Sequence, residues 1–204
     1  PAVYTTKITL EKNLPHAAGL GGGSADAAAT LRAMAQLWQC PIPDILAQAK
    51  LGADVPVCVR GGVVRMQGIG DQLSLGTSFP KTAILLVNPR VPTATPPVFR
   101  ALRDKNNAGL GELPPAFHTG ADLMEWLSHQ RNELQAPAVS LHPEIADVLD
   151  ALCHTNPLLT QMAGSGATCF GLYDTVDAMD VASHYMSEAH PEWWVQPAML
   201  GGVS

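Results

Sequence analysis

The sequence NLPHAAGLGGGSADAAATL, residues 13–31, decides how the first part of this chain folds. Four of the five residues 19–23 are glycine, and an alanine-rich run follows them closely. Glycine lets the backbone take positive φ angles and approach a ligand closely, whereas alanine is the strongest helix former. The stretch therefore predicts a tight loop that leads without a spacer into a helix.

A loop that opens a helix in this way is suited to binding an anion. The first turn of a helix has backbone N–H groups without an intrahelical partner, and the helix dipole favours negative charge there. Ser24 can cap the helix or donate its hydroxyl to a phosphate oxygen or a metal-bound water. The alternative is a purely structural turn capped by Ser24. The loop matches neither the P-loop pattern nor the dinucleotide-binding pattern, and it contains no lysine, so a cation facing a phosphate must come from elsewhere.

The composition is that of a folded globular protein with an acidic surface. Of the 204 residues, 47% are hydrophobic and 15% are charged, which allows a buried core. The formal net charge of −6 argues against broad binding to nucleic acid or to anionic lipid. The sequence contains no apolar run of membrane-spanning length and no signal-peptide pattern. We therefore expect neither a nucleic acid nor a membrane as a partner, while a local positive pocket for a phosphate stays open.

The cysteines and histidines form no ligand pattern. Four cysteines lie far apart and make no CxxC pair: Cys40, Cys58, Cys153 and Cys169. We expect them to be reduced thiols in a cytoplasmic protein, the alternatives being disulfides or a zinc site. His184 and His190 are six residues apart, which does not place them on one helix face. No metal held by the protein alone is expected.

Hydrophobic patterning predicts the elements of the first half. Residues 3–12 alternate and are rich in β-branched side chains, as is typical of a strand. Apolar residues recur at helical spacing over residues 24–38, and residues 44–50 form a short helix that their first residue, an aspartate, can cap. Residues 55–68 resemble two strands joined at the pair Gly61-Gly62, which is a hairpin signal.

The second half mixes strands and helices after a break near residue 80. A strand is expected at residues 82–89, a proline-rich loop at 90–99 and a second loop at 104–118. Further helices are expected near residues 120–130, 143–153 and 175–189, and further strands at residues 168–174 and 193–200. Pro197 places the last strand at a sheet edge. The chain is thus predicted to be an α+β protein with two lobes, residues 1–80 and 81–204.

Five motifs, in this order, resemble those of the GHMP small-molecule kinases. They are LPHAAGLGGGSADAA at residues 14–28, LGADVPVCVRGG at 51–62, VNPRVPTATPPVF at 87–99, RNELQAP at 131–137 and MAGSGATCFGLY at 162–173. The resemblance runs over essentially the whole chain. The triple glycine and the later motifs are most similar to the branch of that family that phosphorylates CDP-methylerythritol.

This resemblance implies a fold and a reaction. The fold is the GHMP kinase two-domain fold, with a ribosomal protein S5 domain 2-like N-terminal lobe, incomplete in this chain, and a ferredoxin-like α/β sandwich as the C-terminal lobe. The reaction is transfer of the γ-phosphoryl group of ATP to the 2-hydroxyl of CDP-methylerythritol in non-mevalonate isoprenoid biosynthesis. Mg²⁺ is expected, because phosphoryl transfer from ATP uses it. A homodimer is compatible with the resemblance.

The resemblance also assigns residues to roles. The loop that binds the ATP phosphates is Gly19, Leu20, Gly21, Gly22, Gly23 and Ser24. Asp54 matches the aspartate that orients or deprotonates the substrate hydroxyl. Thr95 matches a threonine that lines the site, and Phe99 matches an aromatic residue that stacks on the cytosine. A second glycine loop is expected to close near the first, at Gly164, Ser165 and Gly166.

Structural alternatives stand beside these roles. Asp54 precedes an X-Pro step, where an aspartate also favours a turn, although between a helix and a strand its carboxylate can face a cleft between the lobes. Phe99 can pack in a core or anchor a loop, and Thr95 can be an ordinary loop residue. The run Gly164–Gly166 can be a helix-to-strand turn. His16 beside the first loop is interpreted as a surface histidine.

The family pattern also includes a segment upstream of residues 3–12. In the family it carries a lysine paired with the catalytic aspartate and a tyrosine–histidine clamp for cytidine, and the chain starts at Pro1 without it. Lys7 and Lys12 are not expected to replace that lysine, because both lie in or beside the strand before the loop. We therefore expect a piece of a longer kinase. The alternatives are a GHMP kinase for another substrate, such as homoserine or a mevalonate derivative, and an inactive nucleotide-binding remnant.

Overall fold

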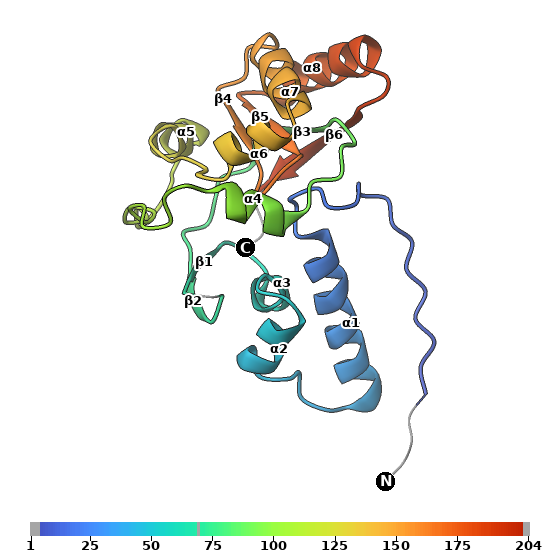
Figure 1. Cartoon of the computed structure of the whole chain (residues 1–204). Helices are drawn as coiled ribbons and strands as arrows, with labels where there is room; N and C mark the ends of the chain where they lie inside the picture. Colours follow the sequence, from blue (N-terminus) through green and yellow to red (C-terminus); the bar gives the residue numbers. More distant parts are fainter. Residues whose placement is uncertain (1–4, 69, 202–204) are drawn as a thin grey trace.

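The computed structural model describes residues 5–68 and 70–201 of the chain. In Figure 1, residues 22–75 build a largely helical part with a small sheet, and residues 82–200 build a second part around a four-stranded sheet. All strand pairs in both sheets are antiparallel. The predicted α+β class is therefore confirmed.

The first part begins with the helix that the glycine loop predicts. Its elements are α1 (Gly22–Trp38), α2 (Ile45–Leu51), α3 (Val55–Arg60), β1 (Val64–Gln67) and β2 (Gln72–Leu75). Asp44 caps α2, as predicted, because its carboxylate accepts a hydrogen bond from the Ala47 N–H at 2.8 Å. α1 packs against α3, which in turn packs against α2.

Two predictions for the first part are wrong, and one of the two roles left open for Ser24 is excluded. Residues 5–12 form no regular secondary structure; Ile8 and Leu10 are exposed, because no strand in the described part of the chain pairs with them, and residues 3 and 4 lie outside that part. Residues 55–60 are helical, since a proline in the first turn favours a helix start, and the hairpin joins β1 to β2 instead. Ser24 does not cap α1, whose N-cap is Gly21 in a left-handed conformation.

The second part is built on a sheet in the order β4–β5–β3–β6. Its strands are β3 (Thr82–Asn88), β4 (Leu159–Met162), β5 (Cys169–Tyr173) and β6 (Trp194–Leu200). The central strand β3 pairs with β5 on one side and with β6 on the other, so that Leu85 lies opposite both Gly171 and Pro197. The edge position predicted for the last strand from Pro197 is confirmed.

Helices cover the two faces of this sheet. They are α4 (Thr95–Ala101), α5 (Gly120–Ser128), α6 (Gln135–Leu141), α7 (Glu144–Cys153) and α8 (Val176–Ala189). Leu85 and Val87 belong to the main core with buried residues of α7 and α8. Ile84 faces the other way, toward a second cluster that includes Leu123 of α5. This alternation is what a strand buried on both faces requires.

The expected helices of the second part are confirmed, and three elements are new: α4, α6 and β4. Residues 90–99 are only partly a loop, because Thr95 begins α4 with two prolines in its first turn. The motif at residues 131–137 contains the start of α6, and β4 pairs with β5 at the sheet edge. The lobe boundary expected near residue 80 falls between β2 and β3 and stays a prediction. Within residues 5–68 and 70–201, no helix is both long and apolar enough to cross a membrane.

Candidate active site

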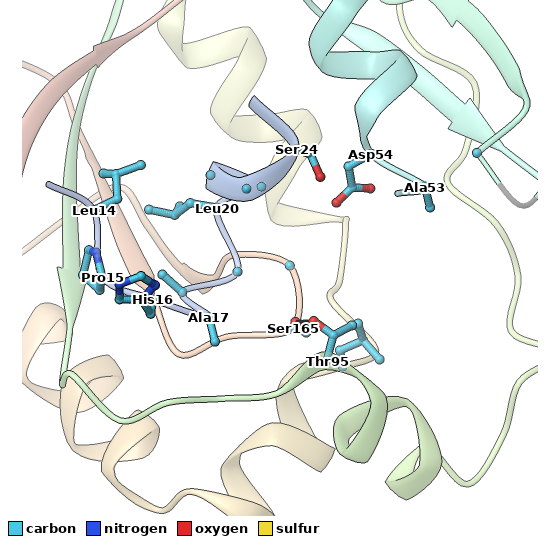
Figure 2. Close-up of a pocket in the computed structure, with 18 of the residues that line it drawn as sticks. Leu14, Pro15, His16, Ala17, Leu20, Ser24, Ala53, Asp54, Thr95 and Ser165 are labelled. Atoms are coloured by element: carbon cyan, nitrogen blue, oxygen red, sulfur yellow. Dashed lines mark hydrogen bonds between the residues drawn. The ribbon is translucent and has the colours of Figure 1, made fainter. Parts of the chain in front are cut away.

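A cavity of about 730 Å³ lies where the two glycine loops, α3 and α4 approach one another. Figure 2 shows the side chains that project into it. Residues predicted for the site line this cavity together: Gly19, Leu20, Gly21, Gly22, Gly23, Ser24, Asp54, Thr95, Phe99, Gly164 and Ser165. Gly166 is the exception. Its backbone, with φ +85°, turns toward the core, and a Cβ there would lie 2.8 Å from the Met162 Sδ.

The first glycine loop presents its backbone to the cavity. Gly21 has a φ of 64° and is the N-cap of α1; its carbonyl accepts from the Ala25 N–H at 2.9 Å. A Cβ placed on Gly21 or Gly23 would have no neighbouring atom within 4 Å. The first backbone N–H groups of α1 have no intrahelical partner. The loop therefore combines open space with the free N–H groups at the start of a helix, as anion binding requires.

The two glycine loops touch backbone to backbone. A Cβ on Gly19 would lie 2.4 Å from the Ala163 carbonyl oxygen, and a Cβ on Gly164 would lie 2.6 Å from the Gly19 carbonyl oxygen. The Thr168 N–H donates to the Ala18 carbonyl at 3.1 Å. The expected closure of the second loop on the first is present, and it leaves no space for a side chain at either position.

Asp54 lies on the opposite wall of the cavity, at the N-cap of α3 rather than at the start of a strand. Its side chain caps no backbone N–H of that helix. Figure 2 shows the Asp54 carboxylate and the Ser24 hydroxyl directed toward each other. Packing of α1 against α3 positions these two groups, so a carboxylate acceptor faces the first turn of the helix that carries the glycine loop.

The charge of Asp54 is felt one turn further along α3. The pKa of the Cys58 thiol is raised by burial and, to a lesser degree, by the Asp54 carboxylate, while Arg32 acts in the opposite direction. The Arg32 guanidinium also donates to the Cys58 carbonyl at 2.8 Å. This arginine anchors α1 to the end of α3 that lies away from the cavity.

α4 supplies the third wall. Thr95 and Phe99 both line the cavity and are four residues apart, so they lie on one face of the helix. The Thr95 and Ser165 hydroxyl oxygens are 2.9 Å apart and share a hydrogen bond, which joins α4 to the second glycine loop. Phe99 keeps 49% of its surface exposed. The core-packing alternative for Phe99 is therefore wrong, and its ring is available to a flat ligand.

Eleven lining residues were not predicted, and Lys12, His16 and Met66 are among them. The Lys12 ammonium forms an ion pair with the Asp26 carboxylate, and a Cβ on Gly22 would lie 3.4 Å from the Lys12 Nζ. Lys12 therefore places beside the loop the positive charge that the loop itself lacks. Sequence spacing gives no signal for this pair, because the irregular path of residues 13–21 brings the two side chains together.

The donor set of the cavity limits its chemistry. Among the residues that the structure describes, no group of three or more His, Cys, Asp or Glu side chains could hold a metal ion. Phosphoryl transfer depends on positioning, on charge stabilisation and on an acceptor for one proton. A helix N-terminus, an ammonium group and a carboxylate around one cavity supply these. The class of protein that this site fits is a phosphotransferase.

Comparison with known proteins narrows this class. Residues 3–62 match the family described as GHMP kinases N terminal domain, and residues 115–192 match GHMP kinases C terminal. A 4-diphosphocytidyl-2-C-methyl-D-erythritol kinase of Cereibacter sphaeroides (strain ATCC 17025 / ATH 2.4.3) is 47% identical over 198 residues, which are 96% of this chain and 71% of the relative. The kinase of the same name from Ruegeria pomeroyi is 50% identical over 189 residues, 92% of this chain and 68% of the relative.

Solved structures that resemble this chain are kinases as well. A crystal structure of 4-(cytidine 5'-diphospho)-2C-methyl-D-erythritol kinase is 31% identical, has a TM-score of 0.70, and is matched over 94% of this chain and 70% of that one. Homoserine kinase from Cytophaga hutchinsonii, 17% identical with a TM-score of 0.65 over 93% of this chain and 67% of that one, shares the fold. The chain therefore belongs to the GHMP kinases, in the family of the 4-diphosphocytidyl-2-C-methyl-D-erythritol kinases. Its class is that of ATP-dependent small-molecule kinases.

Proposed function

We propose that this chain carries the site that transfers the γ-phosphoryl group of ATP to the 2-hydroxyl of 4-diphosphocytidyl-2-C-methyl-D-erythritol. One observation carries the proposal: a single cavity is lined by the glycine loop at one wall, Asp54 at another and the exposed ring of Phe99 at a third. The relatives named for this substrate are 47–50% identical to the chain, which supports transferring their substrate to it.

The nucleotide phosphates bind at the first glycine loop. Backbone N–H groups at the start of α1 donate to phosphate oxygens, and the helix dipole adds to the attraction. Gly21 and Gly23 leave the open space that this approach needs. Lys12 adds a positive charge beside Gly22. In this arrangement the phosphates compete with Asp26 for the ammonium group.

Asp54 is the acceptor of the substrate proton. The oxygen of the 2-hydroxyl attacks the γ-phosphorus, and the bond from that phosphorus to the β–γ bridging oxygen breaks, so that ADP leaves with the bonding electrons. The hydroxyl proton passes to the Asp54 carboxylate, which caps no backbone N–H and faces the cavity. The roles of the site are then complementary: the loop holds the phosphates, and Asp54 orients the attacking oxygen.

Mg²⁺ fits this site as a companion of the nucleotide. Magnesium prefers oxygen ligands and is usually bound by one or two protein groups together with substrate phosphates. The Ser24 hydroxyl, which lines the cavity beside the glycine loop, offers such a group and leaves Asp54 as the proton acceptor. The ion neutralises charge on the phosphates when it is bound. The remaining positioning comes from the chain's own residues.

The cytidine end of the substrate lies against α4. Phe99 offers a ring for stacking on the cytosine, and Thr95, paired with Ser165, offers a hydroxyl near the reacting end. We place the enzyme in the cytoplasm, because Cys40 and Cys153 are exposed free thiols, which suits a reducing compartment.

The test is ADP release from ATP and Mg²⁺ with three acceptors compared in parallel: 4-diphosphocytidyl-2-C-methyl-D-erythritol, homoserine and mevalonate. We expect turnover with the first acceptor only, and its loss in Asp54→Asn with ATP affinity retained. Turnover with homoserine or mevalonate would assign another GHMP substrate. ATP binding without transfer to any acceptor would favour a nucleotide-binding remnant over the kinase.

A further inference from the structure

The motif RNELQAP, residues 131–137, reaches the cavity described above only through Leu134, yet it lies against the second glycine loop. The segment that carries it joins α5 to α6 and runs along the free edge of β4. Hydrogen bonds tie it to that edge: the Gln161 side-chain amide donates to the Gln130 carbonyl at 3.0 Å, and the Met162 N–H donates to the Gln135 side chain at 3.0 Å.

Asn132 makes the contact that reaches the glycine loop itself. Its side-chain Nδ2 donates to the carbonyl oxygens of Met162 at 2.9 Å and of Gly164 at 2.7 Å. Its Oδ1 accepts from the Leu134 N–H at 3.0 Å. Both partners of the nitrogen are acceptors and the partner of the oxygen is a donor, so only this orientation of the amide satisfies all three bonds. One half-buried side chain thereby sets the direction of the Gly164 carbonyl.

Gly164 is in direct backbone contact with the first glycine loop. A Cβ on Gly164 would overlap the Gly19 carbonyl at 2.6 Å, and a Cβ on Gly19 would overlap the Ala163 carbonyl at 2.4 Å. The Thr168 N–H holds the Ala18 carbonyl at 3.1 Å on the same interface. Two backbones in such close contact cannot slide independently. A shift of the second loop therefore moves the first.

We propose that Asn132 is a positioning residue for the nucleotide phosphates: by holding the Gly164 carbonyl it fixes the second glycine loop, which in turn fixes the first. The phosphate-binding role of the first loop rests on the proposed function. The positioning of one loop by the other does not, because it follows from the contacts alone. Asn132 itself does not line the cavity, so its effect on the nucleotide is indirect.

The substitution Asn132→Asp tests the role of the two donated bonds. Aspartate has the same shape and keeps an acceptor for the Leu134 N–H, but it cannot donate to either carbonyl when ionised. Gln135→Ala is the matched control. It removes a bond to Met162 on the same strand and leaves the Gly164 carbonyl untouched. A merely structural role of the segment predicts similar effects of the two substitutions.

Two readouts separate this inference from the proposed function. The first is amide hydrogen exchange without nucleotide, where Asn132→Asp is expected to speed exchange at Gly166 and Thr168 about tenfold, and Gln135→Ala to change it little. The second is the equilibrium dissociation constant for ATP, which is expected to rise about tenfold in Asn132→Asp. The unfolding temperature of Asn132→Asp is expected to be no lower than that of Gln135→Ala, so that lost stability does not explain the weaker binding.

Each outcome has one meaning. Unchanged exchange at the second loop in Asn132→Asp overturns the positioning role, whatever the wild-type chain binds. Faster exchange with an unchanged ATP dissociation constant also overturns it, because the loop then moves without consequence for the nucleotide. If exchange is faster in Asn132→Asp but the wild-type chain binds no ATP, the contact between Asn132 and the second loop is supported and the proposed function is refuted instead.

Discussion

Gly19 and Gly164 occupy positions where the backbones of two loops meet with no space for a side chain. A Cβ on Gly19 would lie 2.4 Å from the Ala163 carbonyl oxygen, and a Cβ on Gly164 would lie 2.6 Å from the Gly19 carbonyl oxygen. Both residues also have positive φ angles, 72° and 53°. Steric crowding and backbone conformation therefore demand glycine at each position independently, and the junction holds the candidate nucleotide site together.

Replacing Gly19 by alanine is expected to destabilise the fold. The new Cβ must displace backbone atoms of the second loop, and a left-handed conformation is unfavourable for alanine. The expected loss is about 2–4 kcal/mol in the free energy of unfolding, measured by urea denaturation. Gly120→Ala is the control, because Gly120 has no atom within 4 Å of its Cβ position and no positive φ. Equal stability of Gly19→Ala and the wild type would show that the loops separate easily.

Replacing Gly23 by alanine separates folding from nucleotide binding. Gly23 lies in the first turn of α1 and lines the cavity, and no atom lies within 4 Å of its Cβ position. Alanine favours the helix, so the free energy of unfolding is expected to stay equal or to rise by up to about 1 kcal/mol. The same methyl group occupies space that a phosphate needs, so the ATP dissociation constant is expected to rise. An unchanged dissociation constant would support the purely structural interpretation of the loop.

Lys12 is expected to contribute to nucleotide affinity through its charge. Its ammonium group pairs with Asp26 and lies beside Gly22 at the cavity wall. Charge-assisted hydrogen bonds to phosphate are stronger than neutral ones, so Lys12→Ala should raise the ATP dissociation constant about tenfold at low salt. Lys7→Ala removes the same charge from the same exposed segment and serves as the control. Equal rises of the ATP dissociation constant in the two variants would mean that Lys12 acts only through the net charge of the chain.

The thiols report on the charge of Asp54. The pKa of Cys169 is raised to about 12 by burial, and that of Cys58 is raised by burial and by Asp54. Because the thiolate is the reactive form, iodoacetamide at pH 8 should label exposed Cys40 faster than Cys58, and should leave Cys169 unlabelled until the chain unfolds.

The Asp54→Asn variant checks the sign of this effect. Removing the negative charge lowers the Cys58 pKa, increases its thiolate fraction at pH 8 and speeds its labelling roughly twofold, with Cys40 as the internal standard. Slower labelling of Cys58 in Asp54→Asn would contradict the placement of the carboxylate near this thiol.

The sequence predicts those parts of the fold and site that local rules determine. The glycine loop, α1 and the capped start of α2 follow from glycine, alanine and aspartate at defined positions. The helices α3 and α4 are not predicted for one reason: valine and proline runs suggest a strand and a loop. Proline in the first turn nevertheless favours a helix start, because the N–H that it lacks has no intrahelical partner there.

The remaining parts of the fold and site depend on contacts between residues far apart in the sequence, which local rules do not predict. Lys12 meets Asp26 across an irregular loop, and Asn132 meets Gly164 across 32 residues. Neither pair has a sequence period that connects its members. Residues 5–12 show the converse case, because their strand pattern is present but no described strand pairs with it. A strand depends on its neighbour as well as on its own residues.

Phe99 is expected to determine affinity for the cytidine end of the substrate without affecting ATP. Its ring lines the cavity, keeps 49% of its surface exposed and lies on α4, whereas the first glycine loop leads into α1. Phe99→Leu retains an apolar side chain and removes the stacking surface, which is worth about 0.5–1.5 kcal/mol. The dissociation constant for CDP, used as the probe, should therefore rise about two- to tenfold, with that for ATP unchanged. Arg100→Ala, next on the helix and not part of the cavity wall, is the control. A parallel loss of ATP and CDP binding in Phe99→Leu would mean that the ring supports the cavity as a whole and that cytidine recognition lies elsewhere.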